Sequence, residues 1–450
     1  MISPVDPDRA ARLAANFSDL VPALTPDEAI AESARCLFCF DAPCTRACPT
    51  HIDVPRFIRQ IMHHNPLGAA ETILDANIFG GSCARACPTE VLCEGACVDN
   101  TLLKSPVQIG RLQRSATDSA DRANVKFHEA GPDTGKRVAI VGAGPAGLTC
   151  AHELRKRGHA VTLFEARDMP GGINTYGIAA YKYRTEFALS EANRVLAIGG
   201  IDLRLNSPVT GPKLAELLRD YDAVFLAIGL GRTAALGIPG EDLPGVWEAL
   251  DFVFQTHTKP LDQCECGRRV VVIGGGNTAV DVATAAVRLE AQVVTIAYRR
   301  GEADMPAFAY EYELTKSDAI DWEFFAAPQR IIAGPDGKAS AVEFLRTRLS
   351  GTGRDAKLEM VAGSEFRIEC DMVVKALGQV ALTEFLSAVP GLKVQSGRVL
   401  VDSQTGATGV DRLFAGGDCV SKGAEVVDAV QDGKIAAAGI HECLRQNRAT

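Results

Sequence analysis

Apolar residues recur along this chain with two different periods, and the change between them divides it. In residues 54–81 the apolar positions repeat every three or four residues, which indicates short amphipathic helices. Thr25, followed three residues later by Glu28, predicts the capping box that begins a helix. We therefore expect an all-helical domain over residues 1–130, ending near a linker rich in Gly, Pro and Asp at 128–136.

After this linker the pattern becomes strand, glycine-rich turn, helix and strand. Residues 136–166 form one such unit, and residues 267–300 repeat it. Each unit is followed by a further buried strand, the first within 221–231 and the second within 370–379. The fold class is therefore α/β: a helical N-terminal domain followed by two Rossmann-like dinucleotide-binding domains with parallel sheets.

Composition narrows the class of protein. A length of 450 residues fits two or three domains, and 47% hydrophobic with 23% charged residues is typical of a globular chain. No apolar run is long enough to span a bilayer and no signal-peptide pattern opens the sequence, so we expect a cytoplasmic protein without a membrane segment. The net charge of −9 argues against nucleic acid as a partner.

The first unit carries a dinucleotide-binding fingerprint between its strand and its helix, namely Gly142-Ala143-Gly144-Pro145-Ala146-Gly147. Glycines there permit a tight turn and a close approach to a pyrophosphate, which the helix N-terminus attracts. Glu165 ends the next strand, where a carboxylate accepts hydrogen bonds from a ribose diol. Together these features predict a dinucleotide site.

The second unit has the related turn Gly274-Gly275-Gly276-Asn277-Thr278-Ala279. Its second strand ends in Arg299 and Arg300 instead of an acid. Two guanidinium groups suit the 2′-phosphate of NADPH, so NADPH is favoured over NADH. The alternative, that both arginines belong to a solvated loop, stays open.

Eight of the fourteen cysteines fall between residues 36 and 97, in two quartets. They are Cys36, Cys39, Cys44 and Cys48, then Cys83, Cys87, Cys93 and Cys97. Soft thiolates at these spacings suit zinc or iron–sulfur clusters. The Cys-Pro steps and the neighbouring nucleotide sites favour two [4Fe–4S] clusters over zinc or disulfides, and by residue type all eight cysteines are candidate ligands.

Two dinucleotide units followed by Gly416-Gly417-Asp418 resemble the flavoproteins of the glutathione and thioredoxin reductase superfamily. The resemblance implies FAD on the first unit, NAD(P)H on the second, and Asp418 on the ribityl chain of the flavin. It implies a discontinuous FAD domain, 131–255 with 380–450, around a nicotinamide domain at 256–379. Gly172 and Gly417 are implied flavin contacts, and the helix near Val426 would direct its N-terminus at the pyrimidine edge of the flavin.

With its cysteine region, nearly the whole chain is similar to the flavin subunit of bacterial dihydropyrimidine dehydrogenase and to the glutamate synthase small subunit. In the dihydropyrimidine enzymes the cluster ligands interleave. Carried onto this sequence, cluster one uses Cys36, Cys39, Cys44 and Cys97, and cluster two uses Cys48, Cys87, Cys93 and Gln113. Cys83 is then left out. Gln113 favours the pyrimidine enzyme, since the glutamate synthase subunit usually has a glutamate there.

The resemblance implies hydride transfer from NAD(P)H to FAD and single-electron transfer through the clusters, with no acid–base residue in a catalytic role. No segment is left over for a pyrimidine site. We therefore expect a hetero-oligomer with a catalytic subunit that holds FMN and iron–sulfur clusters, is similar to dihydroorotate dehydrogenase, and reduces uracil or thymine. The alternatives are a glutamate synthase small subunit, a ferredoxin–NAD(P) transhydrogenase subunit, or a redox sensor without turnover.

Overall fold

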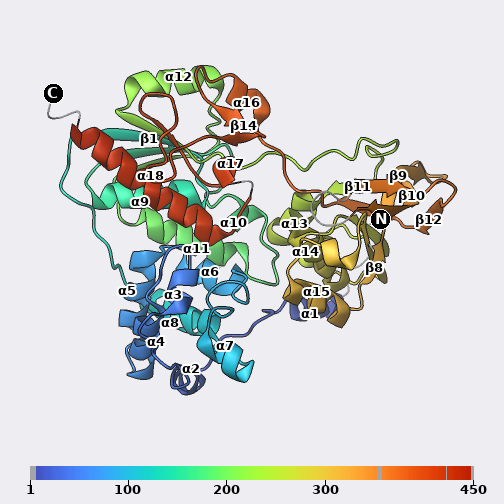
Figure 1. The fold of residues 1–450 in the computed structure, drawn as a ribbon, viewed down its shortest axis with the longest axis horizontal. Helices are drawn as coiled ribbons and strands as arrows, with labels where there is room; N and C mark the ends of the chain where they lie inside the picture. The colour runs from blue at the N-terminus through green and yellow to red at the C-terminus, as the bar shows by residue number, and fades with distance from the viewer. Residues whose placement is uncertain (1–6, 352–356, 422, 447–450) are drawn as a thin grey trace. The chain divides into compact units, whose positions relative to one another are not determined.

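The computed structural model describes residues 7–351, 357–421 and 423–446 (Figure 1). Internal contacts divide the chain into two compact units, and each draws on separate stretches of sequence. Unit 1 comprises Met1–Leu20, Tyr176–Arg184 and Arg232–Val380. Unit 2 comprises Val21–Thr175, Thr185–Gly231 and Ala381–Thr450.

The N-terminal part of unit 2 is helical, as the periodicity predicted. Its helices are α2 (Pro26–Ser33), α3 (Pro43–Ala47), α4 (Val54–Met62), α5 (Pro66–Ala76), α6 (Gly80–Ala86), α7 (Val98–Leu103) and α8 (Ile109–Ala123). The predicted capping box forms: the Glu28 amide donates to the Thr25 hydroxyl, and the Thr25 amide donates to the Glu28 carboxylate. The fully buried side chains of Phe57, Ile73 and Leu112 fill the core between α4, α5 and α8.

The rest of unit 2 is built on a five-stranded parallel sheet in the order β16-β4-β1-β2-β3. The strands are β1 (Arg137–Val141), β2 (Ala160–Phe164), β3 (Ile201–Arg204), β4 (Ala223–Leu226) and β16 (Leu413–Ala415). The helices are α9 (Pro145–Lys156), α11 (Thr185–Leu196), α12 (Gly211–Asp220), α16 (Thr383–Ser387), α17 (Asp418–Ser421) and α18 (Val426–Gln446), and a short hairpin pairs β14 (Val394–Gln395) with β15 (Arg398–Val399). Because β16 comes last in the chain, this sheet is discontinuous, as predicted.

Unit 1 has its own parallel sheet in the order β5-β13-β6-β7-β8. Its strands are β5 (Val246–Glu248), β6 (Arg269–Ile273), β7 (Val293–Tyr298), β8 (Asp321–Phe324) and β13 (Met372–Lys375). An antiparallel layer adds β9 (Ala326–Ala333), β10 (Ala339–Ser350), β11 (Lys357–Met360) and β12 (Phe366–Glu369). The helices are α13 (Ala249–Thr258), α14 (Asn277–Arg288) and α15 (Ala309–Ser317), and α10 (Ile173–Tyr176) ends where the chain enters this unit from unit 2.

Two stretches lie in a different unit from the one expected. Helix α1 (Pro7–Asn16) belongs to unit 1, because Leu13 and Phe17 are buried in its core and Arg9 and Arg12 form ion pairs with Glu290. The end of the expected 131–255 segment also belongs there, because β5 pairs with β13. The division into three domains otherwise stays a prediction.

None of the described helices is long and apolar enough to cross a membrane.

Candidate functional site

The first fingerprint forms a tight turn between β1 and α9. Gly142 has φ +104°, and a Cβ at Gly142 would lie 2.2 Å from the carbonyl oxygen of Ala227. A Cβ at Gly147 would lie 1.9 Å from the carbonyl oxygen of Gly142. Gly144 is open, because only the Cα of Gly172 comes within 4 Å of where its Cβ would be. The turn therefore has the tight packing and the free approach that a pyrophosphate requires.

Other predicted positions converge on this turn. Glu165, directly after β2, accepts hydrogen bonds from the amides of Ala143 (2.8 Å) and Arg167 (2.9 Å). Pro145 and Ala146 begin α9, and a Cβ on Gly417 would touch the Cβ of Ala146 at 3.1 Å. These residues fit the adenosine and pyrophosphate parts of a flavin dinucleotide.

Two carboxylates that were not predicted from the sequence, Asp428 and Asp432, lie near the predicted Asp418. Burial raises the pKa of Asp418, of Asp428 and of Asp432. Asp432 accepts the amide of Gly417 at 2.8 Å, which fixes the Gly-Gly-Asp turn. Val426 begins α18, the helix expected at this place, and the two extra carboxylates lie in its first two turns. In the sequence, only their positions two and six residues after Val426 could have indicated that they belong to this site.

The second fingerprint forms a similar turn in unit 1. A Cβ on Gly274 would lie 2.2 Å from the carbonyl oxygen of Ala376, and one on Gly275 would meet the ring of Tyr298 at 2.5 Å. Gly276 caps α14, Asn277 accepts the amide of Phe308 at 3.0 Å, and Thr278 is exposed. The backbone of this turn therefore has the close packing that a second dinucleotide site requires.

Arg299 and Arg300 follow β7 at the same end of the sheet. Arg299 is exposed and Arg300 half-buried, and neither guanidinium forms a hydrogen bond or ion pair with the residues that the structure describes. Both side chains therefore remain available to an anion.

The thiols of the first cysteine group share one pocket. Cys36, Cys39, Cys44 and Cys97 line it together with apolar side chains such as Val54 and Ile58. Burial raises the pKa of the Cys44 thiol to about 11, and burial beside Cys39 and Cys97 raises the pKa of Cys36. Cys97, from the second quartet, thus joins three cysteines of the first.

Cys48, Cys83, Cys87 and Cys93 interact with one another and form a second group. Contact with Cys83, together with burial, raises the pKa of Cys87, and burial beside Glu94 and Cys48 raises the pKa of Cys93. All fourteen cysteines are free thiols. Among the described residues no group of three or more His, Cys, Asp or Glu side chains has the arrangement of a single-ion site.

Gln113 and Cys83 are both connected to helix α6, which ends directly before Cys87. The amide nitrogen of Gln113, on α8, donates to the carbonyl oxygen of Gly80 at 2.6 Å, and the amide oxygen is the atom of this side chain that has lone pairs to offer to a metal. Cys83 receives a hydrogen bond from the Asn77 amide at 3.2 Å and contacts the thiol of Cys87. Thiolates suit iron–sulfur clusters, and Gln113 and Cys83 both stay candidates for the eighth ligand.

Unit 1 also contains a buried charged cluster beside the second fingerprint, which the sequence reasoning missed. The ammonium group of Lys182 lies 2.9 Å from Asp281 and 2.8 Å from Glu311. The Tyr181 hydroxyl donates to Asp281 at 2.8 Å. Burial alone would lower the pKa of Lys182, but the two carboxylates outweigh it and raise that pKa. This cluster holds the segment Tyr176–Arg184 against α14.

Family models match both parts of the chain. Residues 13–125 match "dihydropyrimidine dehydrogenase domain II, 4Fe-4S cluster", and residues 136–433 match "pyridine nucleotide-disulphide oxidoreductase". A solved structure of Mycobacterium tuberculosis FprA in complex with NADPH is similar in fold, with a TM-score of 0.58 and 20% identity over 71% of this chain and 86% of that one.

Two curated relatives are similar over almost their whole length. The small chain of NADPH-dependent glutamate synthase from Escherichia coli K12 is 34% identical, covering 95% of this chain and 94% of its own. The NAD-dependent dihydropyrimidine dehydrogenase subunit PreT of Salmonella typhimurium is 33% identical, covering 96% and 98%. The predicted resemblance is confirmed, and an FAD- and iron–sulfur-dependent NAD(P)H oxidoreductase is supported. The chain therefore belongs to the pyridine nucleotide-disulphide oxidoreductase family, and its relatives include the glutamate synthase small chain and the PreT subunit.

Proposed function

We propose that this chain is the electron-input subunit of an NAD(P)H-dependent dihydropyrimidine dehydrogenase. The observation that carries the proposal is the shared pocket of Cys36, Cys39, Cys44 and Cys97, together with the hydrogen bond from Gln113 to Gly80 at the start of α6, the helix that ends directly before Cys87. Interleaved thiols and a glutamine are what the resemblance to the pyrimidine enzyme implies.

The ligand sets proposed are Cys36, Cys39, Cys44 and Cys97 for one [4Fe–4S] cluster, and Cys48, Cys87, Cys93 and Gln113 for the other. When bound, FAD and the clusters convert a two-electron hydride into single electrons. The residues of the chain bind and orient these groups. The turn at 142–147 with Gly172 and Gly417 would hold the flavin, and the turn at 274–278 with Arg299 and Arg300 would hold NADPH.

The partner proposed is a catalytic subunit that holds FMN and reduces a pyrimidine ring. Support comes from the subunit names of relatives and from the use of both fingerprints for dinucleotides, which leaves this chain without an assigned pyrimidine site. We also propose a cytoplasmic location, where thiols stay reduced and clusters persist.

A second candidate is the small chain of glutamate synthase, because that relative is as similar as PreT. The test is to purify the chain anaerobically, alone and with each type of partner. NAD(P)H-linked reduction of uracil or thymine only with the pyrimidine-type partner would support the first proposal. Glutamate formation from glutamine and 2-oxoglutarate with the other partner would support the second, and pyrimidine reduction by the isolated chain would refute both.

A further inference from the structure

A buried set of hydrogen bonds connects Asn174 in α10, which begins directly after the Gly172 that faces Gly144, to helix α6. The amide nitrogen of Asn174, two residues after Gly172, donates to the Ser82 hydroxyl at 2.9 Å. That hydroxyl donates in turn to the carboxylate of Glu191. The exposed fractions of Asn174, Ser82 and Glu191 are 1%, 0% and 0%. We call these three residues the α6 joint.

Glu191 also holds the backbone of α6. Its two oxygens accept the amides of Gly81 and Ser82, each at 2.9 Å. A Cβ on Gly81 would lie 2.8 Å from the Glu191 carboxylate and 2.9 Å from the ring of Phe187, so the two helices meet at the closest approach that a glycine allows. Helix α11, which carries Glu191 and Phe187, is therefore seated directly on the first turn of α6.

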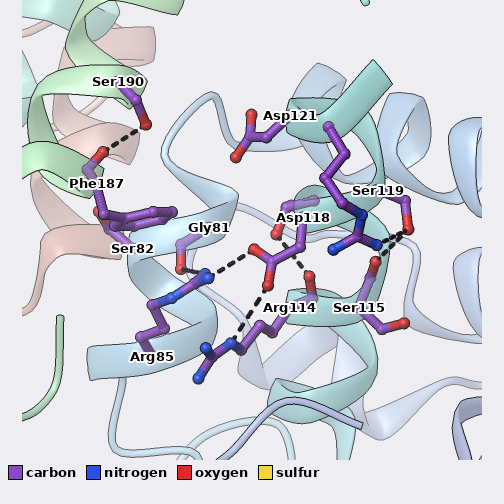
Figure 2. Close-up of polar contacts among 12 residues, drawn as sticks. Gly81, Ser82, Arg85, Arg114, Ser115, Asp118, Ser119, Asp121, Phe187 and Ser190 are labelled. Carbon is purple, nitrogen blue, oxygen red and sulfur yellow. Dashed lines mark hydrogen bonds and ion pairs between the residues drawn. The ribbon is translucent and has the colours of Figure 1, made fainter. Parts of the chain in front are cut away.

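Ion pairs also connect α8 to both α6 and α11. Figure 2 shows Asp118 of α8 between the guanidinium groups of Arg85 and Arg114, at 2.6 and 3.4 Å. The guanidinium of Arg85 also stacks on the Phe187 ring, 3.9 Å from its centroid. Arg194 of α11 forms an ion pair with Asp121 of α8. Helix α11 thus contacts both α6, which carries Cys83 and ends directly before Cys87, and α8, which carries Gln113.

We propose that the α6 joint sets the distance between the flavin and the second cysteine group, and that Glu191 is a positioning residue for electron transfer between them. The inference rests on the proposed function. The step concerned moves one electron from reduced flavin to one cluster: the flavin is oxidised by the loss of that electron and the cluster is reduced by its gain. A carboxylate is suited to this place, because it accepts from two amides and a hydroxyl at once and no neutral side chain offers as many lone pairs.

The test uses anaerobically purified holoprotein with the substitutions Glu191→Gln and Ser82→Ala. The matched control is Glu153→Gln, because Glu153 is a carboxylate of unit 2 that is 12% exposed and whose ion pairs are local, to Lys156 at the end of α9 and to Arg157 directly after it. Stopped-flow absorbance follows reduction of the flavin by NADPH, and freeze-quench EPR follows reduction of the clusters. Hydrogen exchange of the peptide covering α6 and the iron content are measured on the same samples.

We expect Glu191→Gln to leave flavin reduction unchanged, to slow cluster reduction severalfold, and to speed exchange in α6, since electron transfer slows steeply as the distance between donor and acceptor grows. Glu153→Gln should change neither rate. Wild-type cluster reduction in both joint variants with full iron, or equal slowing in the control, would overturn the proposal. If the Glu191→Gln protein lacks iron, the rate of cluster reduction in Ser82→Ala decides for or against the proposal by the same criteria. Failure of the proposed function is distinct: the wild-type protein would then lack iron or its flavin would not be reduced by NADPH.

Discussion

Replacing Lys182 by methionine tests the buried cluster of unit 1. The substitution keeps the length of the side chain but removes the only cation within hydrogen-bonding distance of Asp281 and Glu311 among the described residues. The side chain of Glu311 is 1% exposed. Its Oε1 also accepts the Tyr310 hydroxyl at 2.9 Å, and its Oε2 has no hydrogen-bond partner among the described residues, so loss of the ammonium group leaves a buried carboxylate without a counter-ion. Breaking a buried pair in this way costs about 3–5 kcal/mol of unfolding free energy.

For a unit of about 150–250 residues each kcal/mol shifts Tm by about 2–4 °C, so we expect the Tm of unit 1 to fall by about 6–20 °C. Differential scanning calorimetry measures this shift. The control is Lys316→Met, which breaks an exposed pair with Glu313 in the same unit and should change the unfolding free energy by less than about 0.5 kcal/mol. A second variant, Lys182→Met with Asp281→Asn and Glu311→Gln, should recover most of the loss because no unpaired charge remains.

The loss in Lys182→Met should also depend on pH. Burial raises the pKa of Glu311, and a group with a raised pKa in the folded state contributes stability that is present at low pH and is lost as pH rises through that pKa. The deficit of the variant should therefore shrink when the pH is lowered from about 8 to about 5.5. A Tm within about 2 °C of wild type at neutral pH would refute the reasoning, as would a triple variant no more stable than Lys182→Met.

Three further predictions concern the cofactor sites. Arg299→Ala with Arg300→Ala should raise the KM for NADPH about tenfold to a hundredfold in steady-state dye reduction and leave that for NADH unchanged, because only NADPH has the 2′-phosphate; equal effects on both would contradict the assignment. Cys97→Ser should lower the iron content from about eight to about four atoms per chain, whereas the control Cys266→Ser should keep it. Gln113→Leu should alter the EPR signal of the second cluster, whereas Cys83→Ser should not. The reverse EPR result would make Cys83 the eighth ligand. Gly147→Ala should abolish FAD binding, since its Cβ would lie 1.9 Å from a carbonyl oxygen, whereas Gly409→Ala, where the nearest atom is 3.9 Å away, should retain a full flavin spectrum.

Features encoded by short-range spacing could be predicted from the sequence. The turns at Gly142 and Gly274, the capping box at Thr25 and the strand before Gly417 each depend on residues within one or two elements. The discontinuity of the flavin-type sheet followed from a resemblance and is present in the order β16-β4-β1.

Features that depend on long-range pairs could not be predicted in this way. Lys182 meets Asp281 and Glu191 meets Ser82 only after folding, and no local pattern marks either pair. Helix α1 shows an amphipathic face, but its sequence does not say which core buries Leu13. The eighth ligand likewise depends on where α6 and α8 meet, which spacing alone does not determine.

The late position of β16 has a consequence for biosynthesis. Strand β4 is buried over its whole length and pairs with β16 on one side, yet β16 begins at Leu413, 187 residues beyond the end of β4 at Leu226. Until the ribosome has released that segment, the nascent chain carries an apolar strand with an unpaired edge, the kind of surface that promotes aggregation. A ribosome that stalls within unit 1 would leave this edge exposed, so we expect the newly made chain to depend on chaperones through most of its translation.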